Sequence, residues 1–210
     1  MTQELKSLDH QKRRMFVNWA QKQLENDSDF YRKIVCRDEA HFWLHGIVNK
    51  QNMRYWSDSN PHVLHDSSLH PDNFTVWCGL CAGGVIGPYF FGDDQVRHVT
   101  MNIVTMLTEY FWPPLDDMDL EDMWLQQDGA TSHTPNVTIN LLETLFGESI
   151  ISRNSWSVGR LSHAPLDYFL WGYVKSMVYA NKPVTIDKLR TKMEREIAAE
   201  SADLCLTSKN

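Results

Sequence analysis

The sequence predicts an α/β fold built on a mixed five-stranded sheet flanked by helices. In the first half, short apolar and aromatic runs are separated by turn residues, and Gly83-Gly84 is typical of a β-hairpin. In the second half, strand-like runs alternate with segments whose apolar residues recur at helical spacing. Antiparallel strands followed by strand–helix alternation indicate a sheet that ends in parallel crossovers. A chain of 210 residues, 42% of them hydrophobic, can bury one substantial core.

The first half is expected to hold one helix and then a series of strands. Residues 10–33 have an amphipathic helical pattern with Met15 and Trp19 on the apolar stripe, ended by the polar residues 26–29. The expected strands are short and rich in apolar residues; they cover residues 34–38, 42–44, 53–56, 74–82 and 85–91. Runs 42–44 and 53–56 suggest one hairpin, and the last two runs suggest another.

The second half is expected to alternate helices and strands. The expected helices cover residues 95–112, 137–146 and 166–180, and a last amphipathic helix after Pro183 carries Ile186, Leu189, Met193 and Ile197. Pro113-Pro114 should stop the first of them, and the third, apolar nearly all round, should be buried. Short strands should end just before Asp128 and span residues 149–152. This order of elements is that of the RNase H-like fold.

Composition limits the class of protein. The formal net charge is −7 and the pI is about 5.7, which argues mildly against nucleic-acid binding over the whole surface. Basic residues do gather at residues 12–14 and along residues 182–195, although such runs are more often solvated helix faces. Four unevenly spaced cysteines do not suggest a disulfide framework. No apolar run reaches the ~20 residues of a membrane span, so a soluble intracellular protein is expected.

Three aspartates are expected to meet at one edge of the sheet. Asp38 ends the first strand, Asp128 follows the fourth, and Asp167 begins the helix after the fifth. The first and fourth strands are neighbours in this strand order, and the helix can bring Asp167 across to face them. Three close carboxylates repel one another unless a cation lies between them, and such oxygen ligands favour Mg²⁺ or Mn²⁺. Two ions ~3.5–4 Å apart can support in-line displacement at phosphorus.

Each aspartate alone has a simpler interpretation. An acid at the end of a strand is usually a turn residue, and Asp167 can serve as a plain helix N-cap. The three acids in these elements together favour the metal site.

Four segments carry a resemblance to a known family. They are RDEAHFWL around Asp38, TVWCGLCAGGVIGPYFF, MWLQQDGATSHT around Asp128, and PLDYFLWGYVKSMVYANKP around Asp167. Together they resemble the catalytic domain of mariner-type DNA transposases, over roughly residues 10–200. The resemblance implies that Asp38, Asp128 and Asp167 bind Mg²⁺ or Mn²⁺ and catalyse cleavage at transposon ends and transfer of the freed 3′-hydroxyl to target DNA.

The resemblance also implies an organisation and a setting. Residues 1–33 would form an N-terminal linker helix, residues 34–200 the RNase H-like catalytic domain, and residues 201–210 a disordered tail. DNA, both transposon end and target, is the expected partner, with a homodimer as a further expectation and no membrane association. Nuclear localisation follows from the resemblance only.

The chain departs from the family pattern in two places. Family members carry paired helix-turn-helix modules ahead of this domain, whereas only residues 1–8 precede the match here. The loop over residues 155–164 lacks the usual Pro-Pro pair and has Ser162 in place of an acid. The alternative interpretation is therefore a catalytically inactive, transposon-derived module that binds DNA or protein.

Other polar residues are weaker candidates. His133 is placed to touch substrate phosphate or to cap a helix, and the two interpretations are about equally favoured. Glu39 should point to the face of the strand opposite to Asp38. Four residues are of zinc-binding type: His65, His70, Cys78 and Cys81. Cys78 and Cys81 should face opposite sides of one strand, which disfavours a shared zinc ion.

Overall fold

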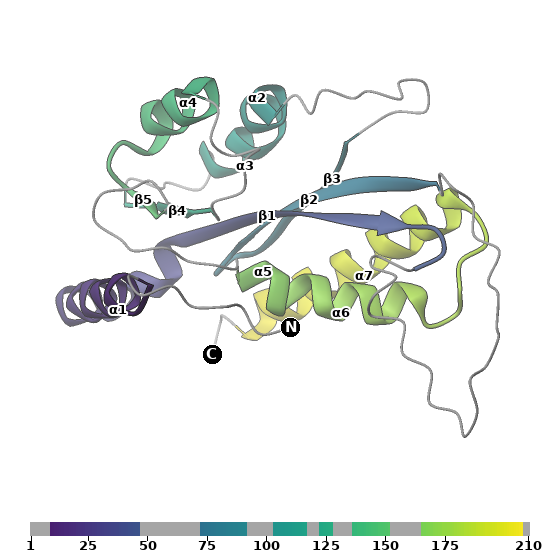
Figure 1. The fold of residues 1–210 in the computed structure, drawn as a ribbon, viewed down its shortest axis with the longest axis horizontal. Coiled ribbons are helices and arrows are strands. Elements are labelled where there is room, and N and C mark those ends of the chain that lie inside the picture. Colours follow the sequence, from purple (N-terminus) through teal and green to yellow (C-terminus); the bar gives the residue numbers. More distant parts are fainter. Residues whose placement is uncertain are drawn as a thin grey trace.

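The computed structural model describes residues 9–46, 72–91, 103–116, 122–127, 136–151 and 165–207 (Figure 1). The helices are α1 (Asp9–Asn26), α2 (Ile103–Thr105), α3 (Trp112–Asp116), α4 (Asn136–Phe146), α5 (Pro165–Tyr168), α6 (Leu170–Tyr179) and α7 (Ile186–Thr207), with a 3-10 helix η1 (Phe30–Lys33) and a π-helix η3 (Met106–Phe111). The strands are β1 (Ile34–Trp43), β2 (Asn73–Cys81), β3 (Gly84–Phe91), β4 (Trp124–Gln126) and β5 (Ile150–Ile151).

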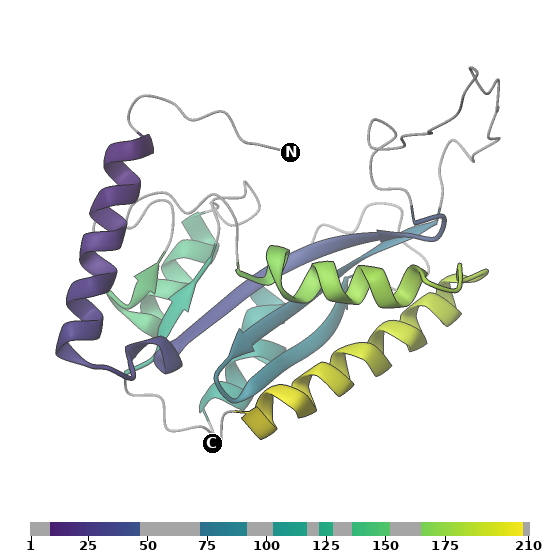
Figure 2. The same cartoon turned by 90° about the horizontal axis from the view of Figure 1, so that it is seen from below.

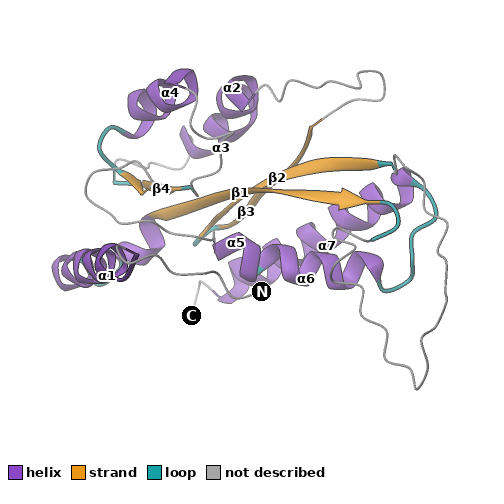
Figure 3. Ribbon diagram, viewed as in Figure 1, coloured by secondary structure: helices purple, strands orange, loops and turns teal. Residues whose placement is uncertain are grey.

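The described strands form one mixed sheet in the order β3-β2-β1-β4-β5 (Figure 3). The β1–β2 and β2–β3 pairs are antiparallel, whereas the β1–β4 and β4–β5 pairs are parallel. Helix α4 lies between β4 and β5 in the chain and supplies the crossover that a parallel pair requires. The predicted fold class is therefore confirmed, and so is the prediction that the first and fourth strands are neighbours.

Helices cover both faces of the sheet, with α2, α3 and α4 on one side and α5, α6 and α7 on the other (Figures 1 and 2). We call the first side the α4 face, where Val35, Trp77 and Leu125 pack with helix residues such as Leu142. The second side is the α6 face. Its core consists of strand residues Ala40, Phe42, Val76 and Cys78 and helix residues Leu166, Leu170, Trp171, Val174, Val178, Leu189, Met193 and Ile197.

Several predicted elements are confirmed. β2 and β3 form the hairpin across Gly83-Gly84, with Cys81 opposite Gly84. α4 ends at Gly147, whose φ of +57° is the left-handed conformation that glycine adopts most easily, and whose N–H donates to the Glu143 carbonyl at 2.9 Å. On the predicted apolar stripe of the last helix, Leu189, Met193 and Ile197 are buried and Ile186 is half-buried.

The predicted break between the strand at residues 34–38 and the strand at residues 42–44 was wrong. β1 runs without a break from Ile34 to Trp43, so Phe42 belongs to the same strand as Asp38 and pairs with Phe74 of β2. The alternation of buried residues continues through Ala40 and Phe42, which is why the strand does not end at Asp38. Residues 53–56, the other half of the expected hairpin, lie outside the described residues.

The prediction that Pro113-Pro114 stops a helix was also wrong. Helix α3 begins at Trp112, directly after the π-helix, and contains both prolines. Proline is tolerated in the first turn of a helix because its missing N–H would have no partner there. The prolines therefore sit at the start of a helical turn that continues to Asp116. Residues 95–102 lie outside the described part of the chain.

The segment 166–180 is buried on one side only, which corrects the prediction that it is buried all round. It divides at Phe169 into α5 and α6. Leu166, Leu170, Trp171, Val174 and Val178 face the sheet, whereas Phe169, Tyr173 and Met177 are 44%, 38% and 39% exposed. The helix packs against the sheet and against α7, so apolar residues on the side that faces neither of them stay in contact with solvent. The following helix, α7, extends to Thr207.

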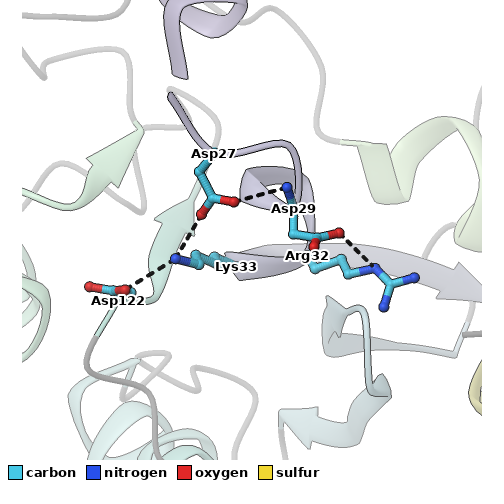
Figure 4. A network of polar contacts seen from close by, with 5 residues as sticks. All are labelled: Asp27, Asp29, Arg32, Lys33 and Asp122. Atoms are coloured by element: carbon cyan, nitrogen blue, oxygen red, sulfur yellow. Dashed lines mark hydrogen bonds and ion pairs between the residues drawn. The ribbon is translucent and has the colours of Figure 1, made fainter. Parts of the chain in front are cut away.

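The N-terminal helix is attached at the start of β1 and β4. Trp19 of α1 packs edge-on against Phe30 and Trp124 at centroid distances of 5.7 and 5.4 Å. Lys33 forms ion pairs with Asp27 at 2.8 Å and with Asp122 at 3.1 Å (Figure 4). The hydrogen bonds to Asp27 and then to Asp122 raise the pKa of Lys33. These contacts hold the beginnings of the two parallel strands together.

No helix in the described part of the chain is both long and apolar enough to cross a membrane.

Candidate active site

Asp38 lies in the middle of β1 with its side chain on the α6 face. The residue is 5% exposed, and its Oδ2 accepts a hydrogen bond from Nε1 of Trp171 in α6 at 3.1 Å. Cys78 of β2 lies directly opposite Asp38 in the antiparallel register. An aspartate inside a strand and covered by a helix is not a turn residue, so the simpler interpretation of Asp38 does not hold.

The neighbours of Asp38 along β1 point to the α4 face. Arg37 is fully buried there, and its Nη1 lies 3.8 Å from Oε1 of Glu39. Successive residues of a strand alternate between faces, so Arg37 and Glu39 share one side and Asp38 takes the other. The prediction that Glu39 points away from Asp38 is confirmed.

Asp167 lies in α5, a short helix that packs against β1 on the α6 face. Its side chain is exposed. Trp171 follows one helical turn later, and Lys175 one turn after that. Burial lowers the pKa of Lys175, and the charges of Asp167 and then Asp38 oppose that change. The ammonium group therefore interacts with both carboxylates, which lie on the same side of the sheet.

The end of β4 is joined to β1 on the α4 face. Nε of Arg37 donates to Oε1 of Gln127 at 3.1 Å, and Nη2 of the same guanidinium contacts that oxygen as well. The Gln127 N–H donates to the carbonyl of Ile151 at 3.0 Å, which continues the pairing of β4 with β5. Asp128, the next residue, lies outside the described residues, as do His133, His65, His70 and the loop over residues 155–164.

The two cysteines of β2 lie on different faces, as predicted. Cys78 belongs to the core of the α6 face, whereas Cys81 packs against the core of the α4 face. In the described ranges, no group of three or more His, Cys, Asp or Glu side chains is arranged to hold a metal ion.

The donors near Asp38 suit a hard divalent cation better than a soft one. Asp38 and Asp167 offer carboxylate oxygens on the same side of the sheet, the ligand type that Mg²⁺ and Mn²⁺ prefer. Burial raises the pKa of Cys78, and burial followed by the charge of Cys81 raises that of Cys36 to about 12. Both thiols stay protonated at neutral pH, so neither offers the thiolate that zinc selects.

Trp171, Lys175 and the Arg37–Gln127 contact were not predicted from the sequence. Trp171 and Lys175 follow Asp167 at intervals of four residues, so helical spacing from a candidate acid was the signal that would have found them. Arg37 and Gln127 each precede a candidate aspartate by one residue. Nothing local indicates that these two side chains meet, because the contact depends on the pairing of β1 with β4.

Comparison with protein-family models and with curated proteins found no match. Solved structures do match. The Mos1 transposase paired-end complex with left transposon end has 17% sequence identity and a TM-score of 0.67, and the match covers 99% of this chain and 60% of that one. The Mos1 strand transfer complex gives 17% identity, a TM-score of 0.63, and coverage of 98% and 58%. The catalytic domain of Mos1 mariner transposase gives 16% identity, a TM-score of 0.60, and coverage of 99% and 90%.

This chain spans about 60% of the length of the Mos1 chains in the two complexes and most of the Mos1 catalytic domain. At these identities the likeness concerns the fold. The strand order, the helices on both faces and the nearly complete coverage agree with the resemblance carried by the sequence motifs. The chain has the RNase H-like fold of the mariner transposase catalytic domain.

Proposed function

We propose that this chain is a mariner-like transposase catalytic domain that cleaves and joins DNA with Mg²⁺ or Mn²⁺ held by Asp38, Asp128 and Asp167. The observation that carries the proposal is the position of Asp38. It is a buried carboxylate on a central strand, and Asp167 lies on the helix that packs over the same face. Burying a carboxylate is costly unless a partner compensates its charge, so a protein retains one where it has a role.

The register of β1 and β4 supports including Asp128. The last described pair of these parallel strands joins Cys36 to Gln126. Asp38 lies two residues after Cys36, and Asp128 lies two residues after Gln126. Residues two apart on a strand share a face, and neighbouring strands are ~4.8 Å apart. This equal offset in the sequence is the reason to include Asp128 with Asp38 in the proposed site.

A divalent cation bound to these carboxylates would activate an attacking oxygen and stabilise the leaving one at phosphorus. The residues of the chain have their own tasks. Asp38 provides a carboxylate whose orientation is set by β1 and by the bond from Trp171. Asp167 is carried by α5, which packs against β1 on the same face. The charges of Asp167 and Asp38 act to raise the pKa of Lys175, against the effect of burial. The Mos1 catalytic domain has been solved with Mn and with Mg, which supports the choice of cation.

DNA as partner is supported by the Mos1 complexes and by a local cluster of charge. Around the turn from α6 to α7, a groove is lined by the basic residues Lys182, Lys188, Lys192 and Arg195, with Asp187 as the acid among the lining residues. The whole chain is acidic, with a net charge of −7, so attraction to phosphate must come from such a local cluster. The Mos1 structures include complexes with the transposon end and a strand transfer complex.

The remaining parts of the proposal concern organisation. We propose residues 1–33 as the linker helix and residues 34–200 as the catalytic domain. Residues 201–207 belong to α7, so the expectation of a disordered tail over residues 201–210 does not hold for them. A homodimer and a nuclear location, where transposition would occur, belong to the same proposal.

The direct test is nicking of duplex DNA that carries the cognate transposon ends. The purified chain should nick this DNA when Mn²⁺ or Mg²⁺ is added, should be inactive in EDTA, and should lose activity in Asp128→Asn. Equal nicking by wild type and Asp128→Asn in Mn²⁺ would reject the proposed enzymatic activity. If both proteins still retard DNA in a gel, the chain is instead the inactive binding module that the altered loop suggests.

A further inference from the structure

One buried side chain connects two of the proposed metal ligands. The indole of Trp171 donates from Nε1 to Oδ2 of Asp38 at 3.1 Å, and Trp171 and Asp38 are 2% and 5% exposed. Trp171 lies four residues after Asp167, in the segment that runs from α5 into α6. The bond therefore joins β1, which carries Asp38, to α6, the helix that directly follows the α5 helix of Asp167.

Packing determines the direction of this N–H group. The Trp171 ring meets Phe42 at a centroid distance of 6.0 Å and an interplanar angle of 69°. Phe42 lies four residues after Asp38 on the same face of β1, so one ring packs along the strand while its nitrogen reaches the carboxylate. A close-packed ring cannot rotate without opening a cavity, and its N–H therefore has one orientation.

We propose that Trp171 is a positioning residue for the metal site. It sets the rotation of the Asp38 carboxylate and ties Asp38 to α6, the continuation of the helical segment that carries Asp167, so that both acids face one divalent cation. An indole N–H donates only, so it favours a carboxylate oxygen that acts as acceptor, as a metal ligand must. This inference rests on the proposed function, because it assumes that Asp38 binds the cation.

A second tryptophan provides a matched control. Trp77 of β2 is also fully buried, but it lies on the α4 face, where it packs on Phe111 at a centroid distance of 5.2 Å. Its Nε1 has no hydrogen-bond partner among the described residues. Trp77→Phe and Trp171→Phe therefore remove the same ring volume from a core, but only the second removes a bond to the proposed site.

The test is calorimetric titration of Mn²⁺ into the wild-type chain, Trp171→Phe and Trp77→Phe. Trp171→Phe should bind Mn²⁺ about 10- to 100-fold more weakly, the usual effect of losing a group that orients a metal ligand. Trp77→Phe should bind as wild type does. Unchanged affinity in Trp171→Phe would overturn the positioning role while leaving the metal site intact. Failure of the wild type to bind Mn²⁺ would overturn the proposed site and this inference with it.

If Trp171→Phe does not fold, a measurement on the wild type tests whether Trp171 positions Asp38 for the metal ion. In a ¹⁵N-labelled sample, the Trp171 indole resonance is assigned through its proximity to the Phe42 ring, and Mg²⁺ is then added. The Trp171 resonance should shift with the same affinity as the calorimetric binding, while that of Trp77 stays in place. A Trp171 resonance that does not move while Mg²⁺ binds would reject the inference, because a merely structural indole would behave in this way.

Discussion

The two faces of β1 carry buried polar side chains that are stabilised in different ways. On the α4 face, Arg37 contacts Gln127 at the end of β4 and Glu39 on its own strand. On the α6 face, Asp38 is bonded to a neutral indole from a helix, and the charges of Asp167 and Lys175 lie on that same helical segment.

The difference separates a structural role from a chemical one. A buried guanidinium that contacts a carboxylate and donates to an amide oxygen holds two strands together. Removal of the guanidinium or of its partner leaves a buried polar group without that interaction. The hydrogen bond from the neutral indole does not neutralise the Asp38 carboxylate, which we propose as a ligand of the cation. Adjacent residues of one strand therefore should respond oppositely to substitution: one in stability, the other in activity.

The largest expected effect is the loss of activity in Asp38→Asn. The amide keeps the shape of the side chain and an acceptor for Trp171 but removes the charge that would bind the cation. Metal-dependent nicking should fall about a thousandfold or more, since such ions contribute several kcal/mol to transition-state stabilisation. The free energy of unfolding, measured in urea, should change by less than about 1 kcal/mol. Glu39→Gln, the neighbouring acid on the α4 face, is the control; an equal loss of activity there would contradict the distinction between faces.

The converse test is Arg37→Met. Removal of the guanidinium leaves the half-buried Glu39 carboxylate without this cation and the buried Gln127 amide oxygen without this donor, and this should destabilise the chain by about 3–5 kcal/mol. The measurement is the free energy of unfolding in guanidinium chloride. Arg190→Met is the matched control, because Arg190 stacks over the Phe90 ring at 4.3 Å near the surface and should cost under about 1 kcal/mol. If Arg37→Met is as stable as wild type, the contacts of Arg37 on the α4 face do not stabilise the fold, and the structural role assigned to them is wrong.

A smaller effect should appear at alkaline pH through Cys36 on the α6 face. Burial, and then the charge of Cys81, raises the pKa of Cys36 from 9.0 to about 12. Between these values the unfolded thiol has lost its proton and the folded thiol has not, so the folded state binds more protons and stability falls as pH rises. The decrease for wild type relative to Cys36→Ala should approach about 1.4 kcal/mol per pH unit above pH 9. Urea unfolding of both proteins from pH 8 to 10.5 measures it, and a difference that does not vary with pH would contradict it.

The smallest effect is expected at the exposed contacts of Figure 4. Asp122→Ala removes one of the two ion pairs of Lys33, and solvent screens both of them. The thermal midpoint should decrease slightly at low salt and match wild type in 1 M salt. A decrease as large as that of Arg37→Met would mean that burial does not govern the strength of these polar contacts.

Much of the fold follows from local pattern. The Gly83-Gly84 hairpin, the stop of α4 at Gly147 and the apolar stripe of α7 depend on residues close together in the chain, and all three are confirmed. The errors arose where context reversed a local preference. Pro113 and Pro114 usually end a helix, but here they lie in the first turn of a new one. The outer side of α6 is apolar, but no described element packs over Phe169, Tyr173 and Met177.

The candidate site divides in the same way. The order of strands and helices was predicted from the chain and is confirmed, because turn residues and periodicity are encoded locally. The three acids were also chosen from the sequence, and their role as metal ligands stays a prediction. Tertiary structure alone decided that Trp171 donates a hydrogen bond to Asp38 and that two carboxylates affect the pKa of Lys175. It also decided that Arg37 donates a hydrogen bond to Gln127, 90 positions away in the sequence. Such contacts depend on which strand lies beside which and which helix covers which face. They are set by the burial of the whole core, which no single segment specifies.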